Sequence, residues 1–315
     1  MKFRTEIEVP KSEYEITHSM QGLSVGSCFT SYIGLRLKYD KFPILVNPFG
    51  TVFNPISIAN SLDLLTKTQK VTESDLIENA GVWTSFKLHG SFSSVSKQGV
   101  LQKYKKQLEE FQNLSKIDYT IITLGTSWVY EYVKTQELVS NCHKFPAKDF
   151  YRYRLSVEQV QTALNQIVLK LLGLNPRAKI IFTISPIRHW KDGAYENQLS
   201  KSTLFLAVDE VIKEHACAEY FPAYELVMDD LRDYRFYEQD MLHPNVQAIS
   251  YIQDKFYATY FSDETKQLIE SIREVSRGLN HIAFNPDSAE HKKFTEKLQA
   301  KINKLSCEHN ITFEL

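Results

Sequence analysis

The sequence predicts an α/β fold in which a parallel β-sheet is covered by helices on both faces. Two observations support this: short apolar runs rich in β-branched or aromatic residues, and longer amphipathic stretches that alternate with them. The apolar runs are too short for helices, and strand–helix–strand alternation is typical of buried parallel sheets. Active residues in such folds stand in loops at the carboxyl ends of the strands.

The elements can be assigned in order along the chain. Within the third expected helix, Val160, Leu164 and Ile167 fall on one face at spacings of three and four, and Gly173 marks its end. The expected strands are 22–26, 42–46, 119–125, 178–185 and 218–225. The expected helices are 55–67, 100–114, 156–174, 197–216 and 244–261.

The end of the chain has a different pattern, because no further strand of this kind follows residue 261. Two polar helices are expected there, the second opened by a capping box of Asp287 and Glu290. We therefore expect an α/β domain over 1–261 and a helical extension over 262–315. The extension would pack on the main domain or on a partner, and an oligomer formed through it is one open expectation.

Composition restricts the class of protein. Lys and Arg number 37 against 38 Asp and Glu, a net charge of −1 with no long block of one sign, which argues against nucleic acid or a membrane surface as partner. No stretch approaches the roughly 18 uninterrupted apolar residues of a membrane span, and no secretory signal is recognisable. The four cysteines lack C-x-x-C spacing, which predicts reduced thiols and a cytoplasmic location.

The turn in "LSVGSCFTSYIG" (23–34) offers a candidate nucleophile. Ser27 stands where the first strand gives way to a helix, so its hydroxyl would meet backbone N–H groups and the positive end of the helix dipole. Serine is also a common N-cap, and the turn alone favours that structural role. Cys28 is the alternative, since a thiolate is a better nucleophile and a helix N-terminus lowers its pKa. One residue farther along a helix turns the side chain by about 100°, which predicts that Cys28 packs toward the sheet.

A serine needs a base, and "YEQDMLHPN" supplies one. Asp240 and His243 stand three residues apart, just before the expected helix 244–261. Asp240 would orient the imidazole and stabilise the imidazolium, while His243 takes the proton of Ser27. A chance D-x-x-H in a surface loop is the competing interpretation.

The segment "GSCF" (26–29), followed by Thr30, resembles the name-giving motif of the GSCFA domain family, which is placed with the SGNH (GDSL-like) hydrolases. The resemblance implies a flavodoxin-like three-layer sandwich with five parallel strands. It also implies a serine esterase apparatus of Ser27, Asp240 and His243. Further matching segments, in the expected order, are "NPFGTVFNP", "LGTSWVY", "NCHKFP", "ISPIRH", "NQLSK", "YFPAYE" and "DDLRDYRFYEQDMLHP".

The resemblance further implies an oxyanion hole built from the N–H of Ser27 and a glycine N–H, for which Gly50 is the candidate. The chain departs from the superfamily at the motif that follows the third strand. The superfamily has Gly-x-Asn there, whereas this chain has Gly125, Thr126 and Ser127. Ser127 or Asn54 would then supply the third donor. This departure puts the efficiency of turnover in doubt.

Four further residues are candidates for substrate binding on the same side of the sheet. For His143 and His189, a hydrogen-bonded structural histidine is the favoured interpretation; with Arg188 they would bind an anionic or sugar-like substrate. His89 lies in an insertion, 68–100, expected to overhang the site, or is a solvent-facing loop residue. The histidine spacing requires no metal, and no cofactor is expected.

The residues, taken with this resemblance, predict a serine-dependent ester hydrolase that works through an acyl-enzyme, and the resemblance implies a small-molecule or carbohydrate ester as its substrate. Deacetylation and O-acyl transfer fit equally well. Two alternatives stay open: a binding or scaffold protein of the same fold with weak or no turnover, and a thiol enzyme based on Cys28.

Overall fold

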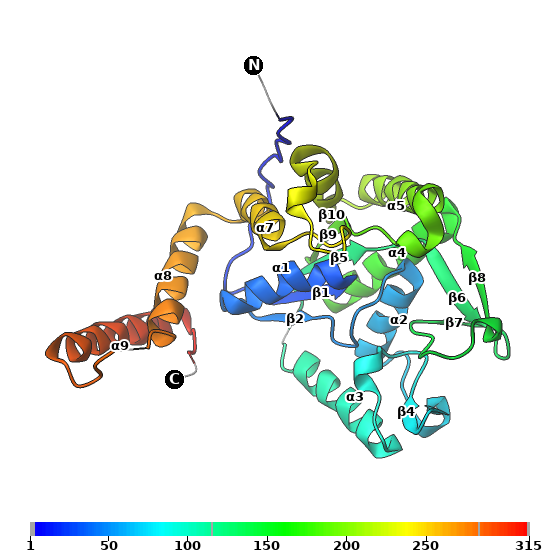
Figure 1. Ribbon diagram of the computed structural model, residues 1–315, viewed down its shortest axis with the longest axis horizontal. Coiled ribbons are helices and arrows are strands. Elements are labelled where there is room, and N and C mark those ends of the chain that lie inside the picture. The colour runs from blue at the N-terminus through cyan, green and yellow to red at the C-terminus, as the bar shows by residue number, and fades with distance from the viewer. Residues whose placement is uncertain (1–3, 115, 283, 314–315) are drawn as a thin grey trace.

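A five-stranded parallel sheet forms the centre of the computed structural model, which describes residues 4–114, 116–282 and 284–313 (Figure 1). Its strand order is β10-β9-β5-β1-β2. With only the parallel strands counted along the chain, this is the order of flavodoxin-like folds, so the predicted fold class is confirmed. The strands are β1 (Gly22–Gly26), β2 (Ile44–Val46), β5 (Tyr119–Leu124), β9 (Lys179–Ile184) and β10 (Ala218–Tyr220).

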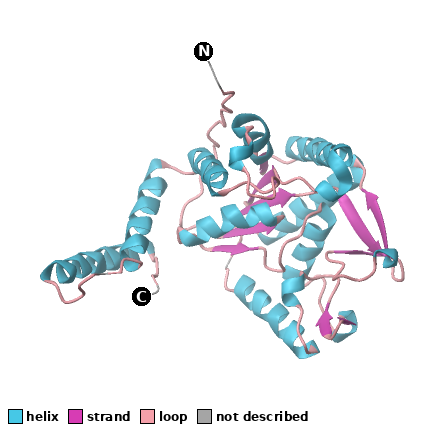
Figure 2. Ribbon diagram, in the orientation of Figure 1, coloured by secondary structure: helices cyan, strands magenta, loops and turns pink. Residues whose placement is uncertain are grey.

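Helices cover both faces of the sheet, as the alternation of elements predicted (Figure 2). Leu23 and Val25 of β1 join the core on the face of α2, α4 and α5, whereas Ile121 of β5 joins the core on the face of α1 and α7. The helices of the α/β part are α1 (Cys28–Tyr39), α2 (Pro55–Leu65), α3 (Lys97–Gln112), α4 (Val157–Leu174), α5 (Gly193–Glu214), α6 (Ala223–Glu225) and α7 (Val246–Tyr260).

Five further strands lie in the loops and were not predicted. β6 (Trp128–Tyr132), β7 (Glu137–Val139) and β8 (Phe150–Arg154) form an antiparallel sheet, and β3 (Ile77–Asn79) pairs with β4 (Val82–Thr84). β6 and β8 carry charged residues between their aromatic ones, and β3, β4 and β7 are only three residues long, so all five lack the longer apolar runs that identified the central sheet. They extend the protein beyond the ends of β5 and α2.

Two helices, α8 (Asp263–Leu279) and α9 (Ala289–His309), project from the α/β part (Figure 1). They pack on each other through a small apolar cluster that includes Ile272 and Leu305. The predicted capping box of Asp287 and Glu290 is wrong, because Ser288 is the N-cap and accepts the N–H of His291. The shift is a single residue, and serine caps as well as aspartate does.

A buried ion pair between Arg273 of α8 and Asp40 joins this helix to the α/β part. Arg273 donates to both carboxylate oxygens of Asp40, at 2.8 and 2.7 Å, and the Asp40 side chain is fully buried. The Tyr257 hydroxyl donates to the same carboxylate at 2.7 Å. The boundary expected after residue 261 stays a prediction. In the described part of the chain, none of the helices has the length and apolar character needed to cross a membrane.

Candidate active site

The candidate site lies at the carboxyl ends of the neighbouring parallel strands β1 and β5, which is the switch point of the strand order, where open α/β sheets bind ligands. β1 ends at Gly26, whose φ of +144° brings its backbone against β5. A side chain at this position would meet the Thr123 carbonyl oxygen at 2.2 Å, so the turn requires glycine. The amide of Asn47 holds the turn from the other side, accepting the Gly26 N–H at 2.9 Å.

Ser27 and Cys28 follow this turn and begin α1. Ser27 is the N-cap with extended backbone, yet its hydroxyl makes no cap hydrogen bond. The Ser27 side chain is 1% exposed, and its Oγ has no hydrogen-bond partner among the described residues. Cys28 is the first helical residue and is only partly buried. The hydroxyl expected to be displayed is therefore enclosed, and the thiol beside it is the more accessible group.

Asp240 and His243 form the pair that the D-x-x-H spacing suggested. Oδ2 of Asp240 lies 2.5 Å from Nδ1 of His243, and Oδ1 accepts the backbone N–H groups of Leu242 and His243 at 2.9 Å each. These two backbone hydrogen bonds, with the one to the His243 ring, lower the pKa of Asp240 to about 2. Asp240 is thus an anion that fixes the orientation of the imidazole, with Nε2 left free to face the site.

Nε2 of His243 faces Cys28. The distance from Nε2 to the Cys28 Sγ is 3.9 Å, within hydrogen-bond range for sulfur, and no hydrogen bond joins His243 to Ser27 among the described residues. Cys28 does pack against the apolar cluster that includes Ile121 of the sheet, as expected, but its Sγ also lies within reach of the His243 ring. Because Cys28 is the first residue of α1 and the loop 240–243 lies over that helix end, the side chain at this position points at the histidine.

Two opposing effects act on the Cys28 thiol. Burial raises its pKa, while the backbone N–H groups of Phe29 and Cys28 itself and the Lys201 ammonium lower it in part. The two N–H groups belong to the first turn of α1, where they have no partner within the helix. The same groups that favour a thiolate would stabilise negative charge on a bound carbonyl oxygen.

The expected oxyanion donors are mostly engaged elsewhere. The Ser27 N–H donates to the Thr123 carbonyl at 3.0 Å, and the Gly50 N–H donates to the Asn47 carbonyl at 2.8 Å. Ser127 is fully buried, and its hydroxyl donates to Ser200. In this conformation, none of these three groups is free to receive an oxyanion, in contrast to the expectation.

Asn54 is the remaining candidate donor. Its Oδ1 caps α2 by accepting the Ser57 N–H at 2.9 Å, whereas its Nδ2 has no partner among the described residues. The carbonyl of the preceding residue, Phe53, accepts the N–H groups of Gly125 and Thr126, so the start of α2 is tied to the loop after β5. Asn54 therefore keeps a free amide donor at the correct edge of the sheet.

Gly125 lies between Ser27 and His189 and is close to both side chains. A side-chain carbon placed on Gly125 would lie 3.3 Å from the Cβ of Ser27 and 3.2 Å from Nε2 of His189. Of the four candidate substrate-binding residues, His189 therefore lies beside the turn of Gly26, Ser27 and Cys28, called the nucleophile turn below for the candidate nucleophiles it carries. Its pKa is lowered to about 4, mainly by burial and then by the Lys201 ammonium, so its imidazole is neutral.

Sequence reasoning missed Lys201, which lies beneath this arrangement. Its side chain is fully buried, and its ammonium donates to the carbonyl oxygens of Gly125 at 2.8 Å and Ser185 at 2.6 Å. Burial lowers its pKa to about 7. The lysine thereby joins the ends of β5 and β9. Its position on the buried face of α5, with Leu204 and Val208 at spacings of three and seven, is the signal that could have identified it.

The other candidate residues are placed apart from the nucleophile turn. His143 contacts Thr84 and the carbonyl of Ser85, which fits the structural role, and burial lowers its pKa. His89 packs its Cβ against Gly50 and caps a short turn, and burial lowers its pKa as well. In the described parts of the chain, no group of three or more His, Cys, Asp or Glu side chains could hold a metal ion.

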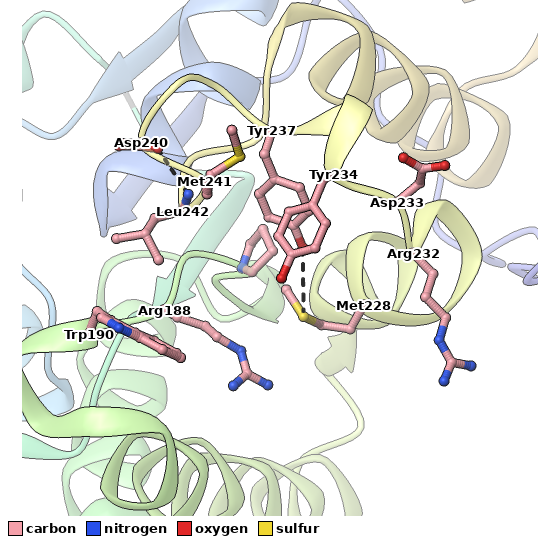
Figure 3. Close-up of a pocket in the computed structure, with 11 residues that line it drawn as sticks. Arg188, Trp190, Met228, Arg232, Asp233, Tyr234, Tyr237, Asp240, Met241 and Leu242 are labelled. Atoms are coloured by element: carbon pink, nitrogen blue, oxygen red, sulfur yellow. Dashed lines mark hydrogen bonds between the residues drawn. The ribbon is translucent and has the colours of Figure 1, made fainter.

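Arg188 lines a pocket of about 490 Å³ that borders Asp240 (Figure 3). Trp190 and Arg188 lie on one side of it, and Tyr234 and Tyr237 lie across from them. The remaining lining residues are Pro186, Met228, Arg232, Asp233, Met241 and Leu242.

The family of the chain follows from its sequence. The GSCFA family matches residues 22–256, and the C-terminal domain of GSCFA domain proteins matches residues 272–315. The chain belongs to the GSCFA family, as its motifs predicted. No curated protein matches it.

Several solved structures are similar in fold. One is a carbohydrate esterase of family 3 from Talaromyces cellulolyticus, at 10% identity and a TM-score of 0.38, covering 81% of this chain and 99% of that one. Another is the acetyl xylan esterase Est2A from Butyrivibrio proteoclasticus, at 11% identity and a TM-score of 0.40, covering 86% of this chain and 66% of that one.

Proposed function

We propose that this protein is an ester hydrolase that works through an acyl-enzyme on Cys28, with His243 as the base and Asp240 as its orienting partner. The contact of 3.9 Å between the Cys28 Sγ and the His243 Nε2 carries the proposal. The hydrogen bond of 2.5 Å between His243 Nδ1 and Asp240 supports it, because it leaves Nε2 available to accept a proton. The expected serine nucleophile is replaced here by the neighbouring thiol.

The steps follow the general scheme of acyl transfer. His243 takes the thiol proton, and the thiolate sulfur attacks the ester carbonyl carbon. The tetrahedral intermediate collapses, the carbon–oxygen bond to the alcohol breaks, and the imidazolium returns its proton to the leaving oxygen. Water, deprotonated by His243, then attacks the thioester and releases the carboxylic acid and the free thiol. A sugar hydroxyl in place of water would give O-acyl transfer.

Negative charge on the carbonyl oxygen needs donors, and two sources support the proposal. The first-turn N–H groups of α1, at Cys28 and Phe29, face the sulfur and have no helical partner. The Asn54 amide nitrogen is free at the start of α2. Removing one such donor typically costs about 10²–10³ in kcat.

Hydrolysis of p-nitrophenyl acetate by matched variants tests the proposal. We expect Cys28→Ala and His243→Ala each to lower kcat/KM by a factor on the order of 10³ or more. Ser27→Ala, the neighbouring substitution of comparable size, should stay within about tenfold of the wild type. Loss of activity in Ser27→Ala, with activity retained in Cys28→Ala, would show that Ser27 is the nucleophile and would contradict the proposal. Absence of ester turnover in the wild type would favour the scaffold alternative.

A further inference from the structure

The pocket beside the catalytic loop contains arginine side chains without acidic partners. Among the described residues, neither Arg188 nor Arg232 has a carboxylate within 4.0 Å, although both line the pocket. The two acids that line it are already engaged. Asp240 holds His243, and Asp233 accepts the backbone N–H of Arg235 and pairs with its guanidinium.

Arg188 follows β9 at the active edge of the sheet, and its guanidinium has only weak neutral contacts. It donates to Oε1 of Gln198 at 3.4 Å and to the Tyr224 hydroxyl at 3.5 Å. Both distances lie beyond the usual range for N–H···O hydrogen bonds. A bound oxyanion would replace them with shorter, charge-assisted hydrogen bonds, to which the planar guanidinium is well suited.

Aromatic side chains surround this cation. Trp190 is 54% exposed and Tyr234 is 76% exposed, while Tyr237 is half-buried beside Tyr234 (Figure 3). Large aromatic groups left open around a pocket indicate a surface that becomes covered when a ligand binds. Their flat faces suit the carbon–hydrogen face of a sugar ring, and the Tyr hydroxyls and the indole N–H can bond its hydroxyl groups.

The pocket also borders the loop that carries the proposed base, His243. Asp240 and Leu242 line it and belong to the same loop as His243. On the opposite side, Arg188 is followed by His189, whose ring lies against Gly125 at the nucleophile turn. A ligand in this pocket would therefore place its outer groups on Arg188 and Trp190 and an acylated oxygen toward His243.

We infer that the pocket binds the alcohol part of the substrate and selects an O-acylated sugar that carries a carboxylate or phosphate group. Arg188 receives the anion, and Trp190 and Tyr234 pack on the ring. This inference rests on the proposed ester chemistry for its acyl group, but not for the recognition of the anion and ring.

Binding of deacylated probes tests the inference without requiring turnover. Calorimetric titration compares glucuronic acid, glucose 6-phosphate, glucose and inorganic phosphate on the wild type, Arg188→Gln and Arg177→Gln. Arg177 is a matched control, because it is an exposed arginine before β9, at the opposite end of the strand from Arg188. The carboxylate and phosphate probes distinguish the two sources of negative charge.

We expect at least one of the two anionic sugars to bind about tenfold or more tightly than glucose. Arg188→Gln should remove that preference, and Arg177→Gln should keep it. Equal binding of glucose, no binding of either anionic sugar, or a preference that survives Arg188→Gln would each overturn the inference. Inorganic phosphate that binds as tightly as glucose 6-phosphate would overturn the role of the aromatic residues. Ester turnover measured on the Cys28 variants is independent of these outcomes.

Discussion

The Sγ atom of Cys28 lies 3.9 Å from the Nε2 atom of His243, and the Asp240 carboxylate holds the other ring nitrogen at 2.5 Å. The two partners are 215 residues apart in the sequence and meet because β1 and the loop before α7 end at the same edge of the sheet. The proposed nucleophile, base and orienting acid are thus connected through the two nitrogens of one imidazole ring.

Alkylation of Cys28 by iodoacetamide should accelerate with pH. Burial raises the pKa of the thiol above its ordinary value of 9.0, and only the thiolate reacts. The rate at Cys28 should therefore rise about tenfold per pH unit through neutral pH and continue to rise beyond pH 9. Mass mapping of the peptide that contains residue 28 measures it, with Cys28→Ser as control. A fast rate that is flat with pH near neutrality would contradict the raised pKa.

Two substitutions separate the two functions of Asn54, which are to cap α2 and to donate a hydrogen bond to the oxyanion. Asn54→Asp keeps the oxygen that caps α2 but loses the N–H donor, whereas Asn54→Ala loses both. We expect both variants to lower kcat on p-nitrophenyl acetate by about 10²–10³-fold. Only Asn54→Ala should also lower the free energy of unfolding, by about 1 kcal/mol. Full activity in either variant would remove Asn54 from the oxyanion hole.

Lys201 gives the protein a stability that depends on pH. Burial lowers its pKa from 10.5 to about 7, so between these values the unfolded chain binds a proton that the folded chain does not. Stability therefore rises with pH in this window, by up to about 1.4 kcal/mol per unit. The free energy of unfolding, measured by denaturant titration, should therefore rise more steeply from pH 7 to pH 10 in the wild type than in Lys201→Met. Parallel stability curves would show that the amine stays charged in the folded protein.

The buried pair of Asp40 and Arg273 should anchor α8. Arg273→Ala leaves the fully buried Asp40 carboxylate with weaker partners, and breaking such a pair from one side costs about 3–5 kcal/mol. Arg277→Ala, an exposed arginine one turn along the same helix, should cost less than about 0.5 kcal/mol. Urea unfolding measures both. Equal stability of the two variants would show that the ion pair contributes little.

The central sheet was predictable because most of its strands are short apolar runs, the exception being β10 with Glu219 at its centre, and Leu23 and Ile121 show the two-sided burial that such runs indicate. The partnership of Asp240 and His243 was also suggested by their spacing. The choice between Ser27 and Cys28 could not be made from sequence, because it depends on where the loop 240–243 lies over α1. Lys201 was missed for a related reason, since its partners are backbone carbonyls that a sequence pattern does not reveal.

The most direct test of the account is to identify the residue that carries the acyl group. The wild type is mixed with p-nitrophenyl acetate, stopped with acid, digested and mapped by mass spectrometry across the peptide that contains Ser27 and Cys28. We predict one acetyl group on the Cys28 sulfur, removed by neutral hydroxylamine as a thioester is, and accumulating in His243→Ala if deacylation is slowed more than acylation. An acetyl group on the Ser27 oxygen, or none on this peptide while hydrolysis proceeds, would contradict the account.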